Sequence, residues 1–170
     1  MQKIRILFAV LIIVPFVASA SKLDERRLSF FHTHTAEELT VTYFRNGEYV
    51  ADALAELNHF LRDFRTGDAI EMNPGVFDIL HQIQVASDSS GTFEVISAYR
   101  SPATNEMLRG KSSGVARNSQ HLLGNAIDVR LRGFDTARLR EIALSLELGG
   151  VGYYKESDFV HVDTGRVRQW

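Results

Sequence analysis

His121 and Asp128 stand seven residues apart in the stretch SQHLLGNAIDVRL, residues 119–131. Residues 126–131 form a strand-like run, which places Asp128 in the middle of a predicted strand. A buried carboxylate is costly unless it is paired, hydrogen-bonded or bound to a metal. Asp128 is therefore either a solvent-facing residue on a half-exposed strand or, together with His121, part of a metal site whose third ligand lies elsewhere in the chain.

A second segment with suitable chemistry is DFVHVDTG, residues 158–165. On a strand, alternate side chains share a face, so His161 shares one face with Phe159 and Asp163 while two valines share the other. Such a strand would present its valines to a core and its His–Asp face to a polar cleft. His161 is therefore a candidate for the third ligand.

The absence of cysteine limits the kind of metal site that this chain can form. It excludes disulfides, thiolate zinc sites and a cysteine nucleophile. Any metal must be held by His, Asp or Glu, and a mixture of imidazole and carboxylate suits zinc. A catalytic zinc takes three protein ligands and keeps one position open for water, a requirement that His121, Asp128 and His161 would meet.

The bulk composition bounds the class of protein. The 170 residues are 45% hydrophobic and 24% charged, which suits one soluble domain with a proper core. The net charge of −2 gives no global basic field, so we expect no nucleic-acid partner. No repeat or interdomain linker follows residue 20, and we expect a single domain over residues 21–170, acting as a monomer.

The first twenty residues, MQKIRILFAVLIIVPFVASA, have the layout of a secretory signal peptide. Lys3 and Arg5 precede a short apolar stretch, and Ala-Ser-Ala at residues 18–20 forms a small-x-small cleavage site. The apolar stretch is short for a membrane-spanning helix, which needs about 20 residues. We therefore expect cleavage, a periplasmic location and no membrane span in the mature protein; an uncleaved N-terminal anchor is the alternative.

Periodicity and turn signals predict the elements that would position these residues. Two strands around a polar turn are predicted over residues 26–50, followed by a helix over 51–67. The later elements are a second helix that opens at Asn73-Pro74, a strand at 92–100, a short helix at 103–110, a loop at 111–120, the Asp128 strand, a helix at 135–150 and two short C-terminal strands. This order predicts an α+β fold, with a small antiparallel sheet, helices packed on one side and a zinc cleft on the sheet.

The motifs also carry a family resemblance. SQHLLGNAIDV matches the pattern S-x-H-x-x-G-x-A-x-D of the zinc D-alanyl-D-alanine peptidase-like (LAS-type) enzymes, which cut bacterial cell-wall peptides. ISAYRS before it, and GGVGYY and FVHVDTG after it, complete a signature that resembles the murein endopeptidase K branch of that group. The resemblance runs from about residue 28 to the closing RVRQW.

The resemblance implies a role for each matching residue. His121, Asp128 and His161 would be the ligands of one zinc ion per chain. Arg100, in YRS, matches an arginine that holds substrate or a polarised carbonyl, and a fixed guanidinium suits both tasks. Ser119 matches a hydroxyl that contacts the substrate or supports a ligand.

The general base has two candidates. Several relatives place a Glu three residues before the last ligand, where this chain has Asp158. Strand parity favours Asp163 instead, because Asp163 shares a face with His161. Asp158 lies at the start of the strand, where parity is loose, although its side chain is shorter than that of Glu. The sequence favours Asp158 narrowly and leaves Asp163 as the alternative base or as a carboxylate that supports His161.

The activity that the resemblance implies is zinc-dependent hydrolysis of amide bonds in peptidoglycan cross-links, during growth or remodelling of the cell wall. Such a murein endopeptidase would be of the DD or LD type, cutting either the D-Ala–diaminopimelate bond or the diaminopimelate–diaminopimelate bond. A D,D-carboxypeptidase that acts on stem peptides and a non-catalytic peptidoglycan-binding module are the alternatives. A serine hydrolase is disfavoured because the sequence has no G-x-S-x-G elbow.

Four other histidines are interpreted as non-ligands. His32 and His34 have a spacing that would suit a metal, but they lie amid Thr and Glu and are predicted to form an exposed strand face. His59 is expected on the surface of a helix, and His81 is expected to be half-buried beside the core. Arg130 alternates with core residues and is expected to be solvated.

Overall fold

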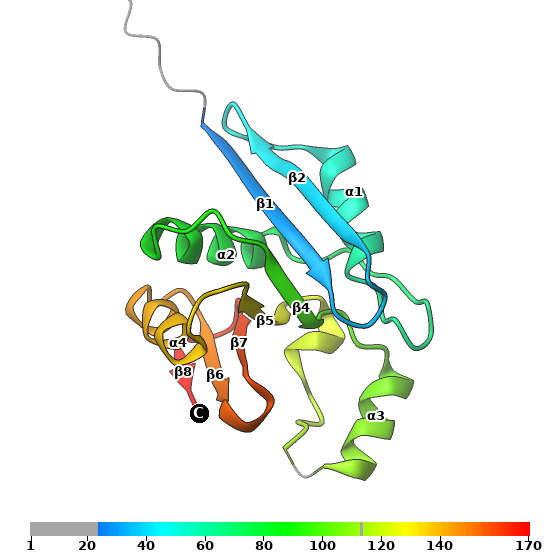
Figure 1. Ribbon diagram of the computed structural model, residues 1–170. Helices are drawn as coiled ribbons and strands as arrows, with labels where there is room; N and C mark the ends of the chain where they lie inside the picture. The colour runs from blue at the N-terminus through cyan, green and yellow to red at the C-terminus, as the bar shows by residue number, and fades with distance from the viewer. Residues whose placement is uncertain (1–23, 113) are drawn as a thin grey trace, which may run out of the picture.

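A sheet of eight strands, in the order β3-β2-β1-β4-β5-β7-β6-β8, is the framework of the protein (Figure 1). The computed structural model describes residues 24–112 and 114–170, so the predicted signal peptide at 1–20 lies outside the described residues. The strands are β1 (Glu25–His32), β2 (Glu38–Arg45), β3 (Glu48–Tyr49), β4 (Phe93–Ser97), β5 (Ala126–Leu131), β6 (Gly150–Tyr154), β7 (Phe159–Asp163) and β8 (Arg168–Gln169). The helices are α1 (Ala51–Phe60), α2 (Pro74–Ala86), α3 (Pro102–Lys111) and α4 (Thr136–Ser145), with short 3₁₀ helices η1 (Gln120–Leu123) and η2 (Lys155–Ser157).

The predicted α+β class is confirmed, but the sheet is neither small nor purely antiparallel. β4 pairs with β1 in parallel and β8 pairs with β6 in parallel, whereas the remaining neighbours are antiparallel. Parallel neighbours require a long crossover connection, and β4 follows β1 only after β2, β3, α1 and α2. No local sequence pattern reports which strand returns to lie beside β1, and the sequence prediction therefore missed the mixed sheet.

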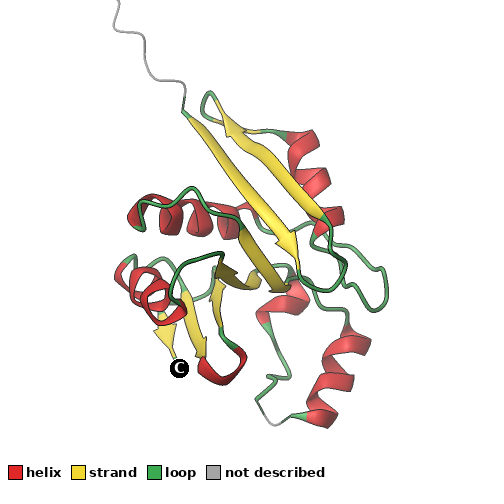
Figure 2. Cartoon of the chain, viewed as in Figure 1, coloured by secondary structure: helices red, strands yellow, loops and turns green. Residues whose placement is uncertain are grey.

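Three of the helices pack against one face of the sheet. Buried side chains of α1, α2 and α4 join those of the strands in one core, which includes Leu57, Phe77 and Leu139. The side chain of Asn73 caps α2 and Pro74 takes the first helical position, as the sequence predicts. α3 adds no residue to this core and stands away from the sheet together with the loop that follows it (Figure 2).

Side-chain alternation places the candidate ligands on the opposite face of the sheet. On β5, Ile127 and Val129 enter the core, and Asp128 between them points the other way. On β7 the two valines enter the core, and His161 lies beside Asp128 as its direct cross-strand partner. The predicted division of β7 into an apolar and a polar face is therefore confirmed.

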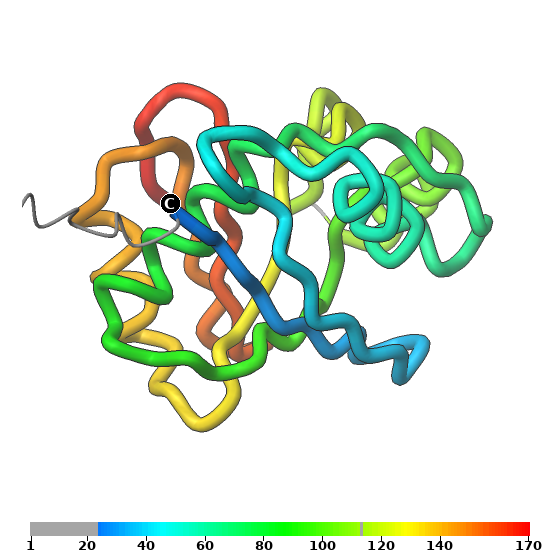
Figure 3. Tube along the Cα trace, turned by 90° about the horizontal axis from the view of Figure 1, so that it is seen from above, coloured from blue at the N-terminus to red at the C-terminus, as the bar shows by residue number. Residues whose placement is uncertain are grey.

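After α3, which lies away from the sheet, the chain returns to the polar face at η1. Viewed from above, α3 and the C-terminal strands lie toward opposite ends of the molecule (Figure 3). The segment between α3 and β5 closes that separation and forms η1 beside β5. Within the described ranges, no helix has both the length and the apolar character needed to cross a membrane.

The prediction of an exposed His32 is wrong. This side chain, at the end of β1, is 1% exposed because it lies on the core side of the strand. Its ring meets the edges of Phe60, in α1, and Phe64, at centroid distances of 5.9 and 5.7 Å. His34 does lie at the surface, with its ring stacked on Phe64. The two remaining histidines lie as predicted, His59 exposed and His81 half-buried.

Candidate metal centre

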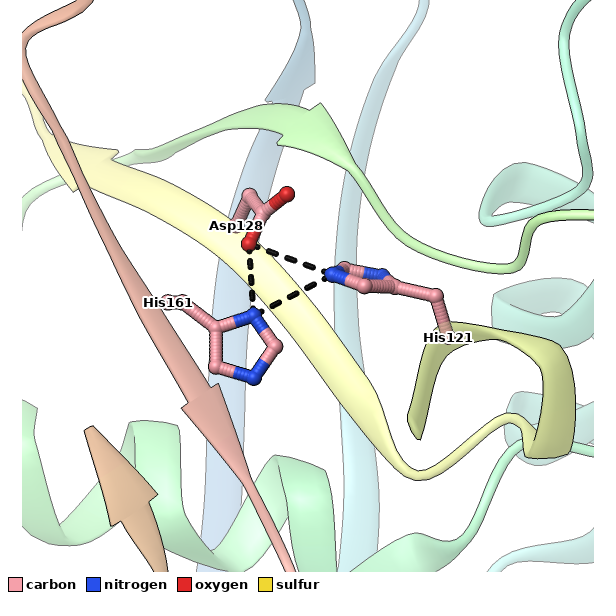
Figure 4. Close-up of side chains that lie close together, drawn as sticks. All are labelled: His121, Asp128 and His161. Atoms are coloured by element: carbon pink, nitrogen blue, oxygen red, sulfur yellow. Dashed lines mark hydrogen bonds and ion pairs between the residues drawn. The ribbon is translucent and has the colours of Figure 1, made fainter. Parts of the chain in front are cut away.

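Side chains of His121, Asp128 and His161 converge on the polar face of the sheet (Figure 4). His121 Nε2 lies 3.1 Å from His161 Nδ1 and 3.2 Å from Asp128 Oδ1. The third edge of the triangle, from His161 Nδ1 to Asp128 Oδ1, is 2.8 Å. Donor atoms of a tetrahedral zinc site, at about 2.1 Å from the ion, lie roughly 3.4 Å from one another. The donors therefore fit a three-ligand zinc site in number and in type, and each edge of the triangle is shorter than the ideal spacing by about 0.6 Å or less.

The positions of the three residues follow from local structure. Asp128 and His161 face each other because β5 and β7 pair with these two residues in register. His121 comes from η1, which ends at Gly124 in a left-handed conformation (φ 68°). A Cβ at Gly124 would lie 2.9 Å from the carbonyl oxygen of Glu71, so a residue with a side chain does not fit there. The glycine between His121 and Asp128 thus permits the turn that brings the two together.

Both imidazole rings are oriented by an acceptor on the nitrogen that faces away from the triangle. The Nδ1 atom of His121 lies 2.6 Å from the carbonyl oxygen of Ala98, and Nε2 of His161 lies 2.9 Å from Asp163 Oδ2. A hydrogen donated to each acceptor leaves the other nitrogen with a free lone pair. Metal-binding histidines are usually oriented in this way.

The charges at the triangle favour a cation. Burial by itself would raise the pKa of Asp128, but the charge and hydrogen bonds of His121 and His161 hold that pKa well below its usual range. Burial also lowers the pKa of His121. At His161 burial has the same tendency, but hydrogen bonds to Asp128 and Asp163 outweigh it and raise the pKa to about 9. The three side chains together therefore hold a proton strongly. This is expected where buried metal-ligand atoms surround a position that favours positive charge.

Arg100, which follows β4, reaches the triangle with an incompletely paired guanidinium. Its Nη2 atom lies 3.8 Å from Asp128 Oδ2 and 3.5 Å from Ser97 Oγ, and Nη1 lies 3.4 Å from Asn105 Oδ1. These contacts are long, and Nε has no partner among the described residues. Burial lowers the pKa of Arg100 while the charge of Asp128 raises it, and a guanidinium stays protonated in proteins. Arg100 can therefore still bind a carbonyl or carboxylate oxygen.

A cleft of about 270 Å³ lies over the triangle. Its lining combines Arg100 and the loop after α3 with three aromatic side chains, those of Tyr154, Phe159 and Trp170. Tyr154 stacks on Phe159 at 4.6 Å, and the indole N–H of Trp170 donates to the Tyr154 hydroxyl at 3.1 Å. Within the described part of the chain, Asp128 is the one carboxylate that lines the cleft. The lining thus suits a substrate that carries carboxylates of its own.

Ser119 lies where the resemblance implies. It is 9% exposed and lines the cleft. Its hydroxyl oxygen also accepts a hydrogen bond from the backbone N–H of His121 at 3.4 Å, which caps η1. Ser119 therefore supports the first ligand through its hydroxyl and borders the space that a substrate would occupy.

The structure does not bring Asp158 to the triangle. Asp158 is exposed, follows η2 with φ at 52°, and has no part in the lining of the cleft. Its carboxylate accepts a hydrogen bond from the hydroxyl of Thr136 and pairs with Arg130 at 3.4 Å. These contacts direct it away from the ligands and argue against a role as the base. Arg130, predicted to be solvated, is half-buried and also pairs with Glu94.

Asp163 does lie at the triangle, but as the partner of a ligand. It is fully buried, and its Oδ2 atom accepts hydrogen bonds from His161 and Arg168. Sequence reasoning missed Arg168, as well as Tyr154 and Trp170. They lie within the quoted motifs GGVGYY and RVRQW. The contacts of Arg168 and Trp170 with the site depend on the pairing of β8 with β6, and that of Tyr154 on the pairing of β6 with β7, which no spacing reveals.

Comparisons with known proteins point to one family. The family model described as Peptidoglycan L,D-endopeptidase MepK matches residues 20–170. The peptidoglycan L,D-endopeptidase MepK of Escherichia coli strain K12 is 40% identical over 162 residues, which cover 95% of this chain and 89% of the relative. The probable peptidoglycan L,D-endopeptidase MepK of Haemophilus influenzae is 39% identical over 155 residues, which cover 91% of this chain and 83% of the relative. No solved structure matches.

Proposed function

Because the chain belongs to the MepK family of peptidoglycan endopeptidases, we propose that it is a zinc-dependent hydrolase of amide bonds in peptidoglycan cross-links. The observation that carries this proposal is the triangle of His121, Asp128 and His161, with edges of 2.8 to 3.2 Å, at the base of a cleft. Two imidazoles and a carboxylate in this arrangement leave room for an open ligand position, as catalytic rather than structural zinc sites do.

Each residue of the site has a defined task in such a reaction. When bound, zinc supplies the Lewis acidity that activates water near neutral pH. His121, Asp128 and His161 hold the ion, and Asp163 keeps the proton on Nε2 of His161. Arg100 stabilises the negative charge that develops on the carbonyl oxygen of the cleaved amide.

The aromatic side of the cleft completes the site. Tyr154, Phe159 and Trp170 cover part of the space above the ligands with their rings. Hydrogen bonds and ion pairs are stronger where water is excluded, so this cover increases the effect of Arg100 on the developing charge. Ser119 offers a hydroxyl to the peptide on the side of η1.

We further propose that the cleaved bond joins two diaminopimelate residues. The curated relatives are named L,D-endopeptidases. In the diaminopimelate–diaminopimelate cross-link the carbonyl belongs to an L-centre and the amine to a D-centre, whereas in the D-Ala–diaminopimelate cross-link both centres are D. The free carboxylates of diaminopimelate also suit a cleft whose lining contains Arg100 and, among the described residues, no carboxylate except Asp128.

Digestion of purified muropeptide dimers tests both proposals. Dimers with each cross-link are incubated with the zinc-loaded protein and with His121→Ala as the inactive control, and the products are identified by mass spectrometry. We expect conversion of diaminopimelate-linked dimers to monomers by the wild-type protein alone. Release of D-Ala without cleavage of dimers would indicate a carboxypeptidase, and binding without any cleavage would indicate a non-catalytic module.

We also propose that residues 1–20 direct export to the periplasm, where the cross-links lie. The support is the basic start, the apolar centre and the Ala-Ser-Ala site in the sequence. Mass spectrometry of the N-terminus of protein from the periplasmic fraction should find a chain that begins at Ser21. An intact Met1 on soluble protein from the cytoplasm would contradict export and cleavage alike.

A further inference from the structure

Asp163 is held by an unusually complete set of donors. The two terminal nitrogens of Arg168 donate to its two oxygens at 2.9 and 2.7 Å. The backbone N–H groups of Gly165 and Gly150 donate to Oδ1 at 2.8 and 3.3 Å, and His161 Nε2 donates to Oδ2. A bidentate arginine–carboxylate pair fixes both position and plane. Asp163 therefore presents one defined oxygen to His161.

The segment that supplies Arg168 reaches His161 by a second route. We call residues 166–170 the C-terminal segment; it contains β8, which pairs in parallel with β6. The guanidinium of Arg168 lies 4.9 Å from the ring centroid of Trp170, and that ring lies 5.2 Å from the ring of His161. The indole N–H of Trp170 is in turn bonded to Tyr154. His161 is thus contacted at Nε2 through Asp163 and across its ring by Trp170.

Two positions of β6 that face the C-terminal segment, Gly150 and Gly152, are glycines. A Cβ at Gly150 would lie 2.6 Å from Asp163 Oδ2 and would also overlap Arg168. A Cβ at Gly152, the cross-strand partner of His161, would lie 2.6 Å from the ring of Trp170. Glycine weakens a strand and marks places where another group approaches closely. The alternation Gly-Val-Gly therefore keeps one face of β6 open for the arginine pair and the indole.

We propose that Arg168 and Trp170 are positioning residues of the metal centre. Arg168 fixes Asp163, which keeps the proton of His161 on Nε2 and leaves Nδ1 as the ligand atom. Trp170 holds the plane of the same ring. The inference rests on the proposed zinc site and identifies the residues that maintain one of its ligands.

Zinc affinity measures this role independently of turnover. We would determine it by competition with a chelating dye for the mature protein and for the variants Arg168→Gln, Trp170→Ala and Arg166→Gln. Removal of groups that orient a metal-binding histidine typically weakens metal binding about 10- to 100-fold, and we expect this for Arg168→Gln and roughly 10-fold for Trp170→Ala. Arg166 is the matched control, since it is exposed in the same segment and carries the same charge.

The nitrogen chemical shifts of His161 provide a second measurement that a merely structural role would not change. In the zinc-loaded wild-type protein they should report a proton on Nε2 and a metal on Nδ1, and in Arg168→Gln a mixture of states. Arg168→Gln can lower stability because it leaves a buried carboxylate with fewer partners. Trp170 is 49% exposed, so Trp170→Ala spares the core and decides the question if the first variant does not fold.

The possible outcomes distinguish a failure of this inference from a failure of the proposed zinc-dependent function. If the wild-type protein binds zinc and both variants bind it equally tightly with unchanged shifts, Arg168 and Trp170 have no positioning role, and the proposed function stands. If the wild-type protein binds no zinc, the proposed function fails at its first step. Weaker binding in Arg166→Gln, to the same extent as in Arg168→Gln, would assign the effect to charge alone and overturn the inference.

Discussion

His32 and His34, at the end of β1, lie nearly as close together as the two histidines of the triangle but in very different surroundings. The ring centroids of His32 and His34 are 6.0 Å apart, and those of His121 and His161 are 5.0 Å apart. Around His32 the neighbours are the rings of Phe60 and Phe64. Among the described residues no carboxylate forms a hydrogen bond or ion pair with either member of the pair at β1.

The pair at the triangle has two carboxylates as partners. Asp128 lies within 3.2 Å of both rings, and Asp163 accepts from the far nitrogen of His161. The two pairs consequently differ in their response to protons. Burial lowers the pKa of His32 to about 4, whereas the carboxylates overcome burial at His161 and raise its pKa to about 9.

The comparison shows that neither burial nor short sequence spacing identifies a ligand. His32 and His161 are buried to a similar degree, and HTH has the tighter spacing. What distinguishes the triangle is that Asp128 Oδ1 and one ring nitrogen of each histidine point to the same place. A positive charge at that place interacts favourably with all three atoms. The predictions that follow test this distinction, from the largest expected effect to the smallest.

Removal of a histidine from the triangle should abolish zinc binding, whereas removal of a histidine from the pair at β1 should leave zinc binding unchanged. We expect His161→Ala to lose zinc and, because a catalytic metal contributes several kcal/mol, at least roughly 10³-fold in kcat/KM. His34→Ala is the matched control and should retain both. Equal zinc content in the two variants, by elemental analysis, would place the metal elsewhere.

Arg100→Ala should keep the metal and lose the reaction. A lost donor to a developing oxyanion typically costs about 10²- to 10³-fold in kcat, and we expect a loss of this size. Arg130→Ala serves as the control, since Arg130 also leaves the polar face of β5 but pairs with Glu94 and Asp158. Turnover and zinc content are measured on the same samples. Similar losses in both variants would show that general charge, rather than the position of Arg100, is important.

Acidification should act on the stability of the protein through His32. Burial and the charges of His34 and Arg62 lower the pKa of His32, while Glu37 raises it, with a net value of about 4. The unfolded chain has a pKa near 6.5 at this residue and therefore binds more protons between pH 6.5 and 4. The stability that the neutral ring provides is present above pH 6.5 and is lost as the pH falls through 4.

Thermal unfolding over this range of pH checks the expectation. The melting temperature of the wild-type protein should fall more steeply between pH 6.5 and 4 than that of His32→Phe, which keeps an aromatic ring without the titrating group. Parallel profiles for the two proteins would mean that His32 does not titrate as its surroundings indicate.

Asp158→Ala should have the smallest effect on the reaction. Because the Asp158 carboxylate is bonded to Thr136 and Arg130 outside the cleft, we expect turnover within about threefold of wild type and unchanged zinc. A loss of about 10²- to 10⁴-fold, the usual size for a missing acid–base group, would instead restore Asp158 as the base. Steady-state rates on the cleaved dimer distinguish the two results.

The sequence predicted the part of the site that local patterns determine. Alternation on β7 placed His161 on the face opposite its neighbouring valines, and the strand-like run around Asp128 is confirmed as β5. The glycine of the same short motif, Gly124, forms the turn that returns His121 to β5. In each case the relevant geometry extends over fewer than ten residues.

The sequence did not predict what depends on distant pairing or on an unusual backbone conformation. His32 is buried because α1 and Phe64 pack over the end of β1. Its Thr and Glu neighbours in the sequence predict an exposed strand instead. Asp158 adopts a left-handed conformation that turns its carboxylate toward Thr136, and strand parity does not apply there. Arg168 reaches Asp163 only because β8 lies beside β6.

Metal analysis of the mature protein, purified without chelator, tests the central claim most directly. The triangle of His121, Asp128 and His161 predicts about one zinc per chain, loss of activity after removal of the metal with a chelator, and recovery when zinc is added back. Full cleavage of diaminopimelate-linked dimers by protein that has been exhaustively depleted of metal would contradict it.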